Sequence, residues 1–137
     1  MKIPGLRSSC EKVGGIVFFG RMLDKIRLHA QGKLPAGYNL GNGFDGRCTR
    51  FLKVEYNALA ERTLQGGTDE EILEWCFLRD HRPGEEDIFV WNGFMSKRGW
   101  RDDATAHLEE DKKKRGFAGR TDIQTYFDFH KADESED

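Results

Sequence analysis

The chain has no long hydrophobic run, and this absence sets the first limits on what it is. Its longest uninterrupted stretch of aliphatic and aromatic residues is Ile16 to Phe19, far shorter than a membrane span. The initial residues MKIPGLRSS contain no apolar core of the kind that export signals carry. We therefore expect neither a membrane anchor nor an exported protein.

Cysteine and histidine are too few and too scattered to predict a metal centre. Cys10, Cys48 and Cys76 are odd in number and contain no C-x-x-C pair, which argues against a disulfide framework and against a cysteine zinc site. The four histidines show no H-x-x-x-H or H-E-x-x-H spacing. We expect reduced thiols in a cytoplasmic protein, with no metal and no cofactor.

A strong charge of one sign is also absent. The formal net charge is −2 with a pI near 6.1, which gives no global attraction for nucleic acid or for an anionic membrane. In the basic run Lys112–Arg115, the last three residues each follow an acid four residues earlier, the spacing of a solvated helix. We expect no nucleic-acid or membrane partner. Negative charge gathers at 131–137, predicted as an acidic, disordered tail after one helical domain over 1–130.

What the chain does have is helical patterning. Leu and Ala outnumber Val and Ile, and apolar residues at helical spacing predict a first helix over Gly14–Gln31. Thr68 and Glu71 have the spacing of a capping box. The predicted fold is all-α: a compact single-domain bundle of about five to seven helices, with a long glycine-rich loop, Lys33–Gly46, between the first and second helices.

The loop contains a G-x-G-x-x-G string at Gly41–Gly46. A dinucleotide site needs a preceding hydrophobic strand and a βαβ unit, and the pattern here predicts neither. A simpler hypothesis is that the following helix start, with Arg47 and Arg50, binds a phosphate or carboxylate. The alternative is that Asp45 occupies that positive helix terminus and caps it.

A second basic segment spans Asn92–Arg101. Lys97, Arg98 and Arg101 surround Trp100, a mixture suited to an anion with a flat apolar portion. The alternative is that the arginines pair with Asp102 and Asp103 while Trp100 closes the core. The preceding helix is expected to turn Ile88, Trp91, Phe94 and Met95 inward.

The leading functional hypothesis is a binding module for a small anionic ligand or for an acidic segment of a partner protein. Its ligand-binding residues would be Arg47, Arg50, Lys97, Arg98, Trp100 and Arg101.

Two alternatives come from other functional classes. The first is an enzyme of unknown reaction whose cleft contains Asp24, His29 or Cys48; this needs a titratable group with a shifted pKa beside a concave pocket. The second is a structural homodimer formed through apolar residues that are left over once each helix has filled its core stripe. Those residues are Val17, Leu28 and Phe89.

Several long strings resemble one protein family in the same order. They are VGGIVFFGRMLDKIRLHAQGKLP, GFDGRC, LQGGTDEEILEWC and WNGFMSKRGWRD, which are similar to short bacterial proteins of the domain of unknown function 5069. The resemblance covers Ile3 to Asp103; Cys10 stands where an aromatic residue is expected. It implies a compact helical cytosolic domain of bacterial origin, and it brings no reaction, ligand or catalytic residue with it.

Overall fold

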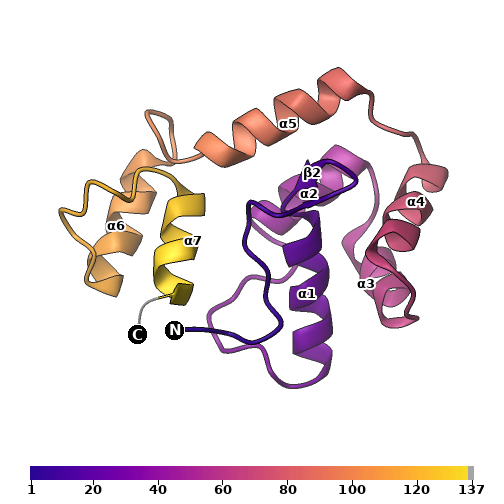
Figure 1. Ribbon diagram of the computed structural model, residues 1–137, viewed down its shortest axis with the longest axis horizontal. Coiled ribbons are helices and arrows are strands. Elements are labelled where there is room, and N and C mark those ends of the chain that lie inside the picture. The colour runs from indigo at the N-terminus through magenta and orange to yellow at the C-terminus, as the bar shows by residue number, and fades with distance from the viewer. Residues whose placement is uncertain (136–137) are drawn as a thin grey trace.

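The computed structural model describes residues 1–135, which form seven helices and one small hairpin (Figure 1). The predicted helical class is thus confirmed in outline, and the two-stranded sheet corrects the all-α prediction. The strands are β1 (Lys12–Val13) and β2 (Ile16–Val17). The helices are α1 (Phe19–Ala30), α2 (Phe44–Leu52), α3 (Tyr56–Leu64), α4 (Asp69–Arg79), α5 (Glu85–Lys97), α6 (Thr105–Arg115) and α7 (Tyr126–Ser135).

The hairpin replaces the first turn of the predicted Gly14–Gln31 helix. Gly14 and Gly15 have φ values of 58° and 81°, and two successive residues with positive φ form the tight turn that suits antiparallel strands. Val13 pairs with Ile16 across it. The chain then passes through Phe18 at a φ of 75°, and α1 begins at the next residue. The apolar residues before Phe19 therefore enter the core from a strand.

The core surrounds α1. Phe19, Met22 and Leu23 are fully buried, and α1 packs on α3 while α5 packs on β2. Side chains of α5 also bind the hairpin backbone: the Trp91 indole donates to the Val17 carbonyl at 3.1 Å, and the Asn92 amide accepts from the Val17 N–H at 3.0 Å. The hairpin thus fixes the position of α5 on the body of the protein.

Helix α4 begins as its capping box predicts. The Thr68 hydroxyl accepts from the Glu71 N–H at 3.1 Å, and the Glu71 carboxylate accepts from the Thr68 N–H at 2.8 Å. Asp69, the residue after Thr68, accepts hydrogen bonds from the Arg7 guanidinium at 2.6 Å and from the Arg27 guanidinium at 2.8 Å. This network ties the start of α4 to the outer side of α1.

The expected disordered tail differs from the structure over Lys131–Ser135, which complete α7. Ala132 is buried, and Glu134 pairs with the buried Arg21 at 2.5 Å; these contacts hold the chain end in a helix. Residues 136–137 of that predicted tail lie outside the described residues. Lys112 is also buried rather than solvated, because its ammonium donates to the carbonyls of Arg120 and Ile123.

Candidate functional site

A groove of about 610 Å³ lies between α2 and α5. One wall is basic and comes from α2 and the residue after it; the other is apolar and comes from α5. The lining residues are Arg47, Arg50, Phe51, Lys53, His81, Asp87, Val90, Trp91 and Phe94.

The periodicity of α2 creates the basic wall. Cys48 and Leu52 are buried in the core, so Arg47 and Arg50, which are three residues apart, lie on the outer side of the helix. Phe51 stacks on Trp91 of α5, with ring centroids 4.7 Å apart and planes 9° from parallel. This aromatic pair joins the two helices at the floor of the groove.

Within the described residues, the cations of this wall have no ion-pair partner, and one of them, Arg47, lies over an aromatic ring. The charge of Arg47 acts on Asp103 only at longer range. The Arg47 guanidinium lies 5.2 Å from the centroid of the Phe94 ring, and Arg50 folds back over Gly46, where a Cβ would come within 3.1 Å of Nη1. Among residues 1–135, no carboxylate forms an ion pair with Arg47, Arg50 or Lys53. The one acid in the lining, Asp87, accepts the Gly84 N–H at 3.0 Å.

Of the predicted ligand residues, Arg47 and Arg50 line this groove. Arg98 lies beside it and lines a second cavity together with Arg47. Arg98 contacts the Phe94 ring at 5.5 Å, but it also pairs with Asp103 at 2.5 Å and with Asp102 at 3.5 Å. The hydrogen bond that Arg98 donates to Asp103 raises the pKa of Arg98. The predicted pairing of an arginine with these acids is therefore confirmed for Arg98.

Lys97, Trp100 and Arg101 lie apart from that group. Within residues 1–135 they line neither of the two cavities described here. Trp100 is 45% exposed, with the Arg101 guanidinium 5.1 Å from its ring, so the alternative that Trp100 closes the core is wrong. The groove instead uses Phe94, which the helical pattern placed inward, and Lys53, which no sequence motif singled out.

A second cavity, of about 540 Å³, separates α1 and the glycine-rich loop from α6 and α7. Its buried cations are already paired: Arg21 with Glu134, and Lys25 with Asp45 at 2.8 Å. Burial lowers the pKa of Lys25 and raises that of Asp45. Arg47 and Arg98 also line this cavity, but so do three carboxylates, Asp111, Asp133 and Glu134. The groove has only one carboxylate in its lining, so the second cavity is the poorer anion site.

Asp45 binds the glycine-rich loop rather than capping α2. Helix α2 has Gly43 at its N-cap and no side-chain cap, although Asp45 lies in the first turn, where a negative charge is favourable. One carboxylate oxygen accepts the Gly41 N–H at 3.0 Å and the other faces Lys25. The loop is thereby fastened to both α1 and α2.

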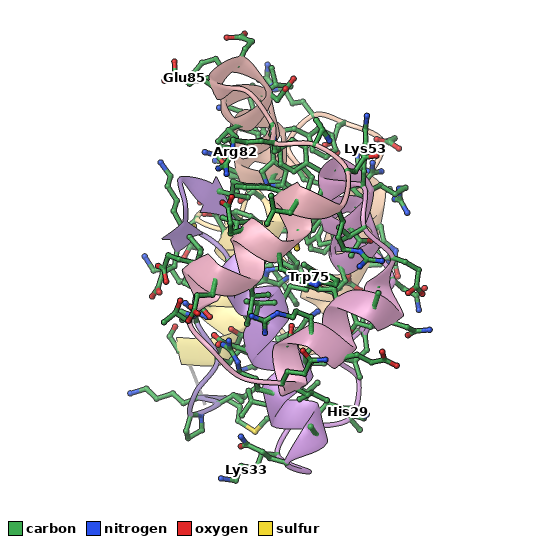
Figure 2. The ribbon with its side chains drawn as sticks, turned by 90° about the vertical axis from the view of Figure 1, so that its right-hand side faces the viewer. His29, Lys33, Lys53, Trp75, Arg82 and Glu85 are labelled. Atoms are coloured by element: carbon green, nitrogen blue, oxygen red, sulfur yellow. The ribbon has the colours of Figure 1, made fainter. Side chains whose placement is uncertain are left out.

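The three residues proposed for an enzyme do not share a cleft in the described part of the chain. Cys48 is fully buried, and burial raises the pKa of its thiol well above the usual value, which disfavours the reactive thiolate. Asp24 pairs with Arg7 at 2.8 Å. His29 is exposed at the C-terminal end of α1, and Figure 2 shows it far from Lys53 and Arg82.

The surface proposed for a homodimer is also corrected. Val17 is buried in the hairpin, and Leu28 is buried with its Cδ2 close to Gly5 of the N-terminal segment. Only Phe89 of the three is exposed. An apolar patch that combines all three residues does not exist.

We expect the protein to lose stability in acid because of the buried side chain of His130. Its Nδ1 lies 2.7 Å from the Ser9 hydroxyl, and burial, then the charges of Arg21 and Lys25, lowers its pKa well below the usual value. Below about pH 6.5 the unfolded chain binds a proton that the folded protein does not. The stabilising effect of neutral His130 is therefore complete above that pH and is lost as the pH falls.

We expect the free energy of unfolding to fall on acidification with a slope contribution of up to about 1.4 kcal/mol per pH unit. Urea unfolding at pH 7, 6 and 5 measures it. His130→Gln should flatten the profile, whereas His107→Gln, at a side chain that is 74% exposed, should leave it unchanged. Superimposable profiles for wild type and His130→Gln would contradict the assignment.

Neither a cluster of metal-binding side chains nor a membrane-spanning helix is found in residues 1–135. No group of three or more His, Cys, Asp or Glu side chains there is placed to hold a metal ion. None of the helices in that range is long and apolar enough to cross a bilayer.

Comparison with known proteins shows the family of the chain. No curated protein sequence matches it. A family match covers residues 3–136, which is nearly the whole chain and extends well past Asp103, where the resemblance drawn from the sequence strings stopped. The chain therefore belongs to the family described as Domain of unknown function (DUF5069).

Proposed function

We propose that the protein binds a small anionic ligand with a flat apolar portion in the groove between α2 and α5. The observation that carries this proposal is the combination of three cations without ion pairs, Arg47, Arg50 and Lys53, with an apolar wall that contains Phe94 and Trp91. The lining has only one carboxylate to oppose them.

The two arginines suit phosphate or carboxylate groups. A planar guanidinium donates two parallel hydrogen bonds to such an anion, and it is weakly hydrated and stacks on aromatic rings. Arg47 is already positioned over Phe94, so binding costs it less rotamer entropy than it would cost a freely rotating side chain. Lys53 adds a point charge at the C-terminal end of α2, where it follows Leu52.

The apolar wall explains why the ligand should be more than a bare anion. Val90 and Phe94 are exposed on one side of the groove, and the stacked Phe51 and Trp91 rings form its floor. A flat ring placed between this surface and the cations would bury apolar area, while its anionic group stays with the arginines. The volume of the groove fits a ligand of small-molecule size.

Thermal unfolding with phenyl phosphate, adenosine 5′-monophosphate and inorganic phosphate tests the proposal. We expect the two aromatic phosphates to stabilise the protein more than inorganic phosphate does, because only they occupy the apolar wall. A ligand at a hundred times its dissociation constant adds about 2.7 kcal/mol, which corresponds to a rise in Tm of roughly 5 to 10 °C.

Arg50→Ala should abolish this shift without unfolding the protein, since Arg50 is exposed. The matched control is Arg79→Ala, because Arg79 is also exposed and also lies over an aromatic ring, Trp75 at 4.7 Å, but does not line the groove. Arg79→Ala should keep the full shift. Equal responses of the two variants, or no shift with either aromatic phosphate, would refute the site.

A further inference from the structure

The outer face of α5 carries apolar side chains that the described chain leaves largely exposed, although the Arg47 and Arg98 guanidiniums lie over the Phe94 ring. Phe89 is 73% exposed, Val90 59% and Phe94 40%. Gly93 lies between them, and a Cβ built there would meet no atom within 4 Å. Figure 1 shows α5 along one edge of the molecule, connecting the α4 side to the α6 and α7 side.

These residues belong to one continuous stripe with a charge at each end. Counting from Glu86, the steps of three, four, seven, eight and eleven residues reach Phe89, Val90, Gly93, Phe94 and Lys97, which all share one face of a helix. The opposite face carries the buried Trp91 and Met95. Glu86 and Lys97 are both exposed, so the stripe reads acid, apolar, base along the helix.

We propose that this stripe is the docking surface for a second copy of the chain, with the two α5 helices antiparallel. In that orientation, the stripe of one copy is complementary to the same stripe of the other copy. Glu86 then faces Lys97 of the second copy, Phe89 faces Phe94, and Val90 faces Gly93. All three pairings have the same midpoint, between Trp91 and Asn92, so one two-fold axis satisfies them together.

The shape of the stripe supports the same arrangement. Gly93 leaves a gap in the ridge of side chains opposite Val90, which permits two helices to approach at the usual interaxial distance of about 8 to 10 Å. The contact uses one helix face, which is smaller than the roughly 800 Å² per partner of a standard stable interface. The dimer is therefore weak and depends on protein concentration.

Charge exchange at the two ends tests the pairing in sedimentation velocity runs from about 1 to 500 µM, the range of weak association. Wild type should pass from monomer to dimer. Glu86→Lys and Lys97→Glu should each raise the dimer dissociation constant about tenfold or more, because each places like charges opposite one another twice. The double variant should restore the wild-type value.

Recovery in the double variant can only report contact between two chains. Within one helix, eleven residues separate Glu86 and Lys97 by about 16 Å, too far for a direct ion pair. Gly93→Leu tests the same contact sterically. In the monomer the new side chain enters open space, so the Tm should not fall. In the dimer it fills the gap that Val90 of the second copy needs, so dimer formation should be abolished.

This inference does not rest on the proposed anion site, although Val90 and Phe94 belong to both surfaces. A ligand in the groove therefore competes with the dimer, so the ligand tests use protein concentrations at which the chain is monomeric. Variants of residues that belong to one surface alone separate the two proposals. Arg50→Ala should leave the dimer unchanged, whereas Gly93→Leu should leave the selective stabilisation by phenyl phosphate in place. A wild-type protein that stays monomeric over the whole concentration range overturns the docking surface. So does a double charge exchange that is as weak as its two single variants.

Discussion

Asp45→Ala should lower the free energy of unfolding by about 3 to 5 kcal/mol, the cost of leaving a buried charge without its partner. Asp45 is fully buried and Lys25 almost so, with their charged atoms 2.8 Å apart. Without the carboxylate, the Lys25 ammonium keeps one hydrogen bond, to the Asn39 carbonyl at 2.8 Å, and the Phe18 ring, whose centroid is 5.6 Å away. The Gly41 N–H also loses its acceptor. Urea unfolding at pH 7 measures the loss.

The position of these contacts gives the prediction a second readout. Both Asn39 and Gly41 belong to the glycine-rich loop, so in Asp45→Ala the amide hydrogens of this loop should exchange faster than those of α4. Lys25→Met with Asp45→Asn should recover part of the stability, because a neutral pair removes the desolvation cost. The asparagine keeps the volume of Asp45 and an acceptor for the Gly41 N–H.

A surface pair provides the control. Glu110 and Lys113 are both more than half exposed and lie 3.5 Å apart, so Glu110→Ala should change stability by no more than about 0.5 kcal/mol. If Asp45→Ala cost as little as Glu110→Ala, the buried pair would not be what holds the loop.

The sequence predicts those elements whose signals are local. The capping box at Thr68 and Glu71 determines where α4 begins, because both hydrogen bonds close within four residues. The predicted end of the first helix at Gln31 agrees with the structure to within a residue: α1 ends at Ala30, and Gly32 follows with a φ of 69°, the left-handed conformation that stops a helix. These features depend on nearest neighbours along the chain, and in the structure they lie at the residues that the sequence pattern indicates.

The hairpin could not be predicted by the same reasoning. Ile16 and Phe19 continue the helical spacing of α1 backwards, so their pattern alone favours a longer helix. The deciding interactions come from far along the chain: the Trp91 and Asn92 side chains bind the Val17 backbone. Tertiary contacts of this kind override a local preference.

For the candidate site, the sequence predicts the basic wall of the groove but not its apolar wall. Arg47 and Arg50 were found because they lie on the polar side of a short helix after the glycine-rich loop. Phe94 was placed inward, since aromatic residues at helical spacing belong to a core more often than to a surface. Its exposure follows from α5 lying at the edge of the fold. One face of α5 contacts the hairpin and α7 and stacks Trp91 on Phe51 of α2, while the other is left open.

The last prediction concerns the chain end. Glu134→Ala should lower the free energy of unfolding by about 3 to 5 kcal/mol, the cost of leaving a buried charge unpaired. The Arg21 side chain is 3% exposed and donates to both Glu134 oxygens, at 2.7 Å and 2.5 Å. Burial raises the pKa of Tyr38, so its hydroxyl stays protonated and donates to the same carboxylate at 3.1 Å.

The neighbouring acid is the matched control. Asp133 pairs with Arg115 at 2.6 Å, but both side chains are about one-third exposed, so Asp133→Ala should cost about 1 kcal/mol or less. Urea unfolding compares the two variants, and equal losses would show that α7 is held by its apolar contacts alone. A larger loss for Glu134→Ala, reversed when Arg21→Leu is added, would show that this carboxylate fastens α7 to α1 and closes one side of the second cavity.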